Sequence, residues 1–427
     1  MARIFRPLRN VLRWISLPQP RSTLVYEPWP DGQSTNRWET IRDAQSLSGA
    51  CHGSRRGSLS VIGLTCEPVV LKLGHPVCSS NRRSERCRSR HDPGGMHLQG
   101  LQKREADYGN GENEMDVAIR PMTEADRPAA KRICHSAFGT FLRAPDPENF
   151  WMDRDYVYGR FGAEHVASFV AEADGEVVGS NFATRWGSVG FFGPLTIRAD
   201  LWNSGLGQQL VGAACDTFAA WDIRHAGLFT FADSAKHAWT YGRFGFHPRF
   251  LTAIMAAPAR LITGTDWSLY GDLPDLERTA AESAVHDLAE ELYPGLDLSS
   301  EIRTATARGL GDTLLTWDGG GRLAGFAICH WGPDSEAGAG CCFVKFGAAR
   351  SGSGSEERFS RLLDACCAFA AATDQANVLA GVNLAREEAY RHMLGRGFRT
   401  QIQGVAMHRQ NEPAYSRSGL FVLDDWR

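Results

Sequence analysis

Two glycines next to a short apolar segment are the residues of this chain that point most directly to chemistry. Gly205 and Gly207 follow the apolar segment 195–197 and stand at the predicted start of a helix. The first turn of a helix presents backbone N–H groups without partners, and glycine lets the oxygens of an anion approach the main chain closely. This pattern predicts a binding site for a phosphate or pyrophosphate, although such a turn can also be a plain helix start.

A tyrosine farther along the chain could move a proton. Tyr241 stands on a predicted helix that Gly245 ends, just before Phe246. A free phenol keeps its proton up to about pH 10. Tyr241 is therefore protonated at neutral pH and could donate that proton. The alternative is that Tyr241 packs in an apolar core with its hydroxyl satisfied.

The elements that must position these residues alternate between strands and helices. The hydrophobic periodicity predicts strands over 117–120, 166–172, 177–184, 189–198, 228–231 and 246–255. It predicts helices over 126–140, 148–161, 205–221 and 234–244. This order is typical of a mixed α/β layer around one sheet.

The element order and both motifs resemble the GNAT acetyltransferase superfamily. Its acyl-CoA loop has the pattern Gln/Arg-x-x-Gly-x-Gly/Ala, which Gly205 and Gly207 fit, while Trp202 replaces the first polar residue. Its helix tyrosine, four residues before a Gly-Phe pair, corresponds to Tyr241. The resemblance covers 115–262. It implies an acetyl-CoA-dependent N-acetyltransferase in which a primary amine attacks directly and Tyr241 is the general acid.

The resemblance also implies where acetyl-CoA binds, with its thioester beside the apolar strand and its pyrophosphate on the loop. The implied binding residues are Leu195, Thr196, Ile197, Trp202, Asn203, Ser204, Gly205, Leu206, Gly207, Gln208, Gln209 and Leu210. No metal is expected. For the general base we retain Asp233 as the catalytic candidate, with Glu172 as an alternative, although either could be a surface acid. We expect His237 to be a solvated residue of its helix.

The remainder of the chain repeats the same domain. The segment 175–179 corresponds to 321–325, and Gly245 corresponds to Gly397. Such offsets predict a duplicated domain. We therefore expect an α/β (mixed α+β) fold of two tandem GNAT-like domains, 115–262 and 263–427, each with a mixed, splayed central sheet flanked by helices.

The second copy lacks the chemical features of the first. Met393 falls opposite Tyr241, and a methionine cannot donate a proton. The turn 350–355 contains glycine but does not match the acyl-CoA loop. The arginines around 386–396 could face a phosphate or, as we prefer, form a solvated basic face. We expect this half to be mainly structural.

Composition excludes other classes of function. A net charge of -3 argues against a general nucleic-acid-binding protein. No apolar run reaches the roughly 18–20 residues that span a bilayer, so we expect no stable membrane insertion. The cysteines lack metal-ligand spacing, which favours reduced thiols and a cytoplasmic location. Residues 1–114 lack sustained periodicity and are predicted to be disordered or an untranslated extension of the reading frame, although their Arg-rich start could be a transit peptide or a membrane-surface helix.

Several alternatives stay open at this point. The chain could be a non-catalytic acyl-CoA-binding or regulatory protein that retains the fold. The amine acceptor could be a small molecule or a peptide, and antibiotic, polyamine, amino acid, thiol precursor and protein amine all fit. A monomer is plausible because tandem domains could form a pseudo-dimer.

Overall fold

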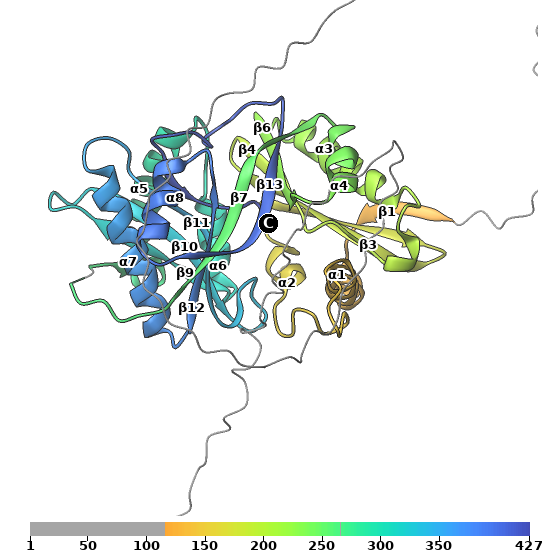
Figure 1. Ribbon diagram of the computed structural model, residues 1–427, viewed down its shortest axis with the longest axis horizontal. Coiled ribbons are helices and arrows are strands. Elements are labelled where there is room, and N and C mark those ends of the chain that lie inside the picture. Colours follow the sequence, from red (N-terminus) through yellow and green to blue (C-terminus); the bar gives the residue numbers. More distant parts are fainter. Residues whose placement is uncertain (1–115, 265) are drawn as a thin grey trace, which may run out of the picture. The chain divides into compact units, whose positions relative to one another are not determined.

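The strands of the chain join into one mixed sheet whose order reads as two equivalent series that meet at its centre. The computed structural model, which describes residues 116–264 and 266–427, gives the order β1-β2-β3-β4-β6-β13-β7-β12-β11-β10-β9-β8, with β5 on β3 and β14 on β11 (Figure 1). The strands are β1 (Val117–Pro121), β2 (Val166–Ala173), β3 (Glu176–Trp186), β4 (Val189–Phe192), β5 (Thr196–Ile197), β6 (His225–Phe231), β7 (Phe246–Pro258), β8 (Ser268–Leu269), β9 (Gly311–Trp317), β10 (Leu323–Gly332), β11 (Gly338–Ala349), β12 (Asn377–Asn383), β13 (Arg399–Arg409) and β14 (Phe421–Leu423).

The two halves of the chain exchange their last long strands. β7 belongs to the first half but pairs with β12, and β13 belongs to the second half but pairs with β6. At the centre β7 and β13 pair with each other in antiparallel fashion, and Figure 1 shows them side by side. The parallel pairs β4–β6 and β11–β12 stand at mirrored places on either side. This arrangement confirms the mixed α/β fold and its internal duplication, while the domain boundary near residue 262 stays a prediction.

Helices cover both faces of the sheet, as the alternation of side chains along a strand requires. Val170 and Ala171 are neighbours in β2 and therefore point to opposite faces. Val170 shares a buried cluster with Ala130 of α1, and Ala171 shares another with Leu210 of α3. The helices are α1 (Arg127–Phe141), α2 (Tyr156–Arg160), α3 (Leu206–Ala220), α4 (Ala235–Gly242), α5 (Asp275–Leu292), α6 (Ser299–Ala307), α7 (Ser355–Ala372) and α8 (Glu387–Gly395).

Two predicted elements differ from the structure. The helix expected over 148–161 is only the short α2, because the Asp155 carboxylate caps it by accepting the N–H groups of Val157 and Tyr158, both at 2.8 Å. The strand expected over 189–198 is broken into β4 and β5 at Pro194, which has no N–H with which to continue a ladder.

The remaining sequence predictions concern the location of the protein and its N-terminal segment. Within the described residues, no helix combines the length and the apolar character needed to cross a membrane. The cytoplasmic location stays a prediction. The predicted disorder and membrane-surface helix of residues 1–114 lie outside the described residues.

Candidate active site

The sheet opens between two parallel strands of the first half. β4 and β6 pair as far as Phe191 and Gly227, and β4 ends one residue later. The chain then returns to the sheet as β5, which pairs with β3 through Thr196 and Ile197. In the described part of the chain the other edge of β5 pairs with no strand. A cavity of about 670 Å³ occupies this opening.

The glycine turn borders the cavity and presents free backbone N–H groups to a ligand. Gly205 caps α3 with a φ of 92°, a left-handed conformation that favours glycine. The N–H groups of Asn203, Gly205 and Gly207 meet no acceptor among the described residues. A Cβ atom added to Gly207 would have Ile197 Cγ1, at 4.0 Å, as its nearest neighbour. The loop is therefore open where an anion would approach it.

Most residues expected to bind acetyl-CoA lie on this cavity. The expected residues that line it are Leu195, Thr196, Ile197, Trp202, Asn203, Ser204, Gly205, Gly207 and Gln208. Leu206 and Leu210 instead point into the apolar core, and Gln209 is exposed. Trp202 donates its indole N–H to the Ile197 carbonyl at 2.8 Å. This hydrogen bond ties the loop to the end of β5, so the unusual residue has a structural role.

Tyr241 also lines the cavity, on the side formed by α4. Its ring packs edge-on against Phe192 with centroids 5.7 Å apart. Its hydroxyl meets no hydrogen-bond partner among the described residues. Burial raises the pKa of Tyr241 well above its ordinary value, because the apolar surroundings penalise the phenolate. The phenol therefore stays protonated throughout the range in which a protein is active.

The two acids considered as general bases do not lie on the cavity. Asp233 is exposed and is not among the lining residues. Glu172 lies on β2, where it pairs with Arg120 at 2.6 Å. In this structure neither carboxylate is positioned to take a proton from a molecule in the cavity.

A histidine that we expected to be solvated lies on the cavity instead. The ring of His237 lies 6.2 Å from that of Tyr241 and 5.2 Å from that of Phe141, measured between centroids. Burial, and then the neighbouring charge of Lys236, lower the pKa of His237. The sequence could have indicated this position, because His237 and Tyr241 are four residues apart and residues at that spacing share one face of a helix. His237 and Tyr241 are thus two proton-transfer groups side by side on α4.

The comparison with known families agrees with this geometry. Residues 132–246 match the Acetyltransferase (GNAT) family. This segment is therefore similar to a GNAT domain. It runs from within α1 to the first residue of β7 and so contains the glycine loop and Tyr241.

Solved structures resemble more of the chain than the matched segment. A candidate acetyltransferase from Pyrococcus horikoshii has a TM-score of 0.52 and 12% identity, covering 73% of this chain and 95% of its own. A GCN5-related N-acetyltransferase from Sphaerobacter thermophilus has a TM-score of 0.47 and 17% identity, covering 69% and 95%. A tandem GNAT protein from the clavulanic acid biosynthesis pathway has a TM-score of 0.46 and 13% identity, covering 69% and 98%. No curated protein matches the chain. The first likeness covers far more of the chain than the family match does, and it agrees with the predicted mixed α/β fold.

In the second half the chain itself fills the corresponding opening. β11 pairs in parallel with β12 as far as Val344, and beyond that point its residues Gly347–Ala349 pair with β14. Phe421 and Leu423 of β14 are buried in the core of this half together with Met393. A protein strand therefore occupies the sheet edge that is free in the first half.

The arginines of α8 and its ends, considered as phosphate ligands, are paired with carboxylates. Arg386 is buried against Asp424, Arg391 pairs with Glu387 at 3.4 Å, and Arg396 pairs with Asp364. The preferred solvated basic face is therefore wrong for Arg386, whose guanidinium is enclosed by the end of the chain.

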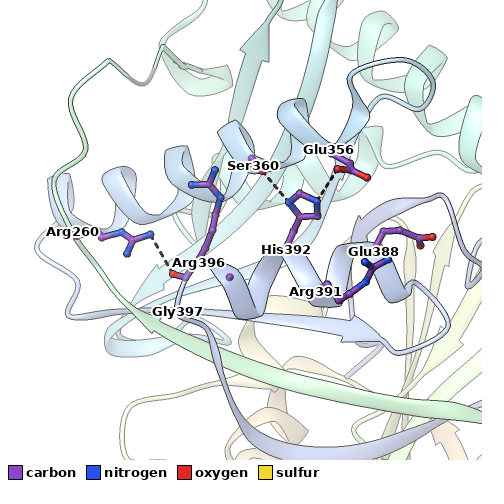
Figure 2. A pocket seen from close by; sticks show the side chains of 9 residues that line it. Arg260, Glu356, Ser360, Glu388, Arg391, His392, Arg396 and Gly397 are labelled. Carbon is purple, nitrogen blue, oxygen red and sulfur yellow. Dashed lines mark hydrogen bonds and ion pairs between the residues drawn. The ribbon is translucent and has the colours of Figure 1, made fainter.

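A groove of about 680 Å³ lies over α7 and α8 (Figure 2). His392 stands between Ser360, whose Oγ is 3.1 Å from Nδ1, and Glu356, whose carboxylate is 3.4 Å from Nε2. The walls carry the glutamates Glu356 and Glu388 together with the arginines Arg260, Arg391 and Arg396. Each of these arginines pairs with a carboxylate, which is Asp364 for Arg260 and Arg396 and Glu387 for Arg391.

Proposed function

We propose that the chain is an acetyl-CoA-dependent N-acetyltransferase that works from its first half on a primary amine. The observation that carries this proposal is one cavity that brings together the open glycine loop, the free edge of β5 and the protonated Tyr241. The loop would hold the pyrophosphate on free N–H groups at the start of α3. The free edge of β5 would pair with the amide groups of the pantetheine arm.

Proton transfer would be divided between two residues of α4. The amine nitrogen attacks the thioester carbonyl and loses its proton to His237, directly or through one water molecule. The C–S bond then breaks, and the departing thiolate takes the proton of Tyr241. His237 suits the first task because its lowered pKa keeps it neutral, and Tyr241 suits the second because its raised pKa keeps it protonated.

With His237 as the general base, kcat/KM should depend on pH. A lowered pKa means that His237 takes up a proton only below about pH 6.5, so kcat/KM should fall as the pH falls through this pKa and stay level above it. The His237→Asn variant should lose this acid limb and lower kcat about a hundredfold. The pH profiles of the two proteins measure this effect. His286→Asn, an exposed histidine of α5, is the control and should match wild type. An unchanged acid limb in His237→Asn would remove His237 from the mechanism.

Because β14 fills the opening in the second half, the structure predicts how many acetyl-CoA molecules the chain binds. We expect one molecule to bind per chain, because β14 already occupies the equivalent sheet edge. Isothermal titration calorimetry of the whole chain should give a stoichiometry near one. In the Gly207→Val variant, whose new side chain enters the open space over the loop, this binding should be lost. A second equivalent of acetyl-CoA, or full binding to the variant, would contradict the assignment.

The function itself is tested by release of free thiol from acetyl-CoA in the presence of a panel of primary amines. The expected result is thiol release that depends on the amine and yields the N-acetyl product by mass spectrometry. The other hypothesis is a non-catalytic acyl-CoA-binding protein. It would be favoured if acetyl-CoA raises the melting temperature while no amine of any class releases thiol.

A further inference from the structure

We infer that the acceptor is an amine carried on a flat aromatic or apolar body and that a polycationic amine is excluded. This inference rests on the proposed acetyltransferase function and adds the substrate class. It comes from two observations on the same cavity, the aromatic side chains of one wall and the signs of its charges.

Part of the cavity wall is built from aromatic rings, which we call the aromatic wall. Trp151, in the segment after α1, packs against Phe138 with centroids 4.6 Å apart and against Tyr156 at 4.8 Å. Phe141 of α1 packs against Phe231 of β6 at 5.1 Å. All five residues line the cavity. Rings held by one another in this way present a large, preorganised apolar surface, which favours a planar apolar partner.

The charged side chains on the cavity are all cations. They are Arg154, Lys236 and Arg427, and no aspartate or glutamate is among the described residues that line it. Burial of several ammonium groups without carboxylate partners is strongly unfavourable. A polyamine or an aminoglycoside would bring several such groups, whereas a monoamine brings one, which aromatic faces can attract.

Three carboxylates close to the lining residues in sequence have partners in the fold. Asp425 pairs with Arg427 at 3.0 Å. Asp155 caps α2 and pairs with Lys131 at 2.9 Å. Asp153 accepts the backbone N–H of Ala339 at 3.1 Å. Because these acids already have partners in the fold, they do not supply the missing negative charge.

His237 connects the aromatic wall to the reacting groups. Its ring lies against Phe141 on one side and against Tyr241 on the other. An acceptor whose ring stacks on the wall would place an amine on a short chain near His237. The same position suits direct attack on a thioester beside Tyr241.

A binding experiment separates this inference from the proposed function, because it needs no turnover. Tyramine and spermidine are titrated by calorimetry into the whole chain saturated with CoA. Tyramine should bind at least tenfold more tightly than spermidine, and Trp151→Ala should weaken tyramine binding about tenfold without changing the affinity for CoA. Trp317→Ala, an exposed tryptophan of β9, is the matched control and should bind tyramine as wild type does.

The inference is overturned if wild type binds spermidine as tightly as tyramine or more tightly, a comparison that needs no variant. It is also overturned if Trp151→Ala binds tyramine as tightly as wild type does. Thiol release by polyamines but not by tyramine would leave the proposed function standing and overturn the substrate class. Preferential tyramine binding without thiol release from any amine would support the cavity's selectivity and overturn the proposed function.

Discussion

Replacement of Tyr241 by phenylalanine should lower kcat about a thousandfold and leave the dissociation constant for acetyl-CoA unchanged. The substitution removes one hydroxyl that has no partner in the described fold and keeps the ring that packs against Phe192. A positioned general acid raises a rate by a factor of roughly 10²–10⁴. If the thiolate leaves without this acid, most of that factor is lost. Steady-state kinetics with the preferred amine, together with calorimetric binding of acetyl-CoA, measure both quantities.

The second half supplies the control for this substitution. Tyr390 stands on α8, the counterpart of α4, and does not line the cavity. Tyr390→Phe should turn over as wild type does. Because burial raises the pKa of Tyr241, wild-type kcat should show no alkaline limb from this residue. Full turnover by Tyr241→Phe at every pH would show that the thiolate leaves without this acid.

The parts of the site that follow from local sequence could be predicted. The glycine turn stands at the start of a helix, and Tyr241 stands near the end of another. Short segments of sequence determine where helices start and end. His237 shares a helix face with Tyr241, yet its burial depends on Phe141 of another helix, and a single helix does not reveal that contact. The break at Pro194 was visible as a residue type, but its effect on the strand was missed.

The parts that depend on distant pairing could not be predicted. The exchange of β7 and β13 joins segments whose sequences are compatible with pairing inside their own halves as well. β14 follows irregular residues, and its position on β11 is decided by the opening that it fills. The aromatic wall likewise combines Trp151 with Phe231, which only the fold brings near one another. The resemblance to the GNAT superfamily implied the reaction class, which stays a prediction, and tertiary contacts were needed to propose an acceptor.

The largest effect on stability is expected at a buried ion cluster that joins the two halves. Glu336, between β10 and β11, pairs with Arg160 of α2 at 2.8 Å and with Lys345 of β11 at 2.6 Å. The three side chains are only 2%, 3% and 5% exposed for Glu336, Arg160 and Lys345. Arg160 also donates to the Gly193 carbonyl at the end of β4, which borders the cavity. The cluster therefore holds the second half against the wall of the active site.

Glu336→Ala should lower the free energy of unfolding by about 3–5 kcal/mol, because it leaves two buried cations without a carboxylate. Denaturant unfolding of the whole chain measures the change. Glu176→Ala is the control, since Glu176 and its partner Arg198 are both exposed at a separation of 3.3 Å, and we expect a loss below about 1 kcal/mol. Equal losses in the two variants would show that the cluster adds nothing beyond a surface pair.

The same cluster should make stability depend on acid. Burial opposes the ionisation of Glu336, but Arg160 and Lys345 outweigh it and hold its pKa at about 2. Because this pKa lies below the value of about 4.3 for a free glutamate, the carboxylate stabilises the fold fully above that value and progressively less as the pH falls toward 2. Glu336→Gln has no such carboxylate, so the stability difference between wild type and Glu336→Gln should shrink over this interval. A difference that stays constant from pH 6 to pH 3 would mean that the charge of Glu336 does not join the halves.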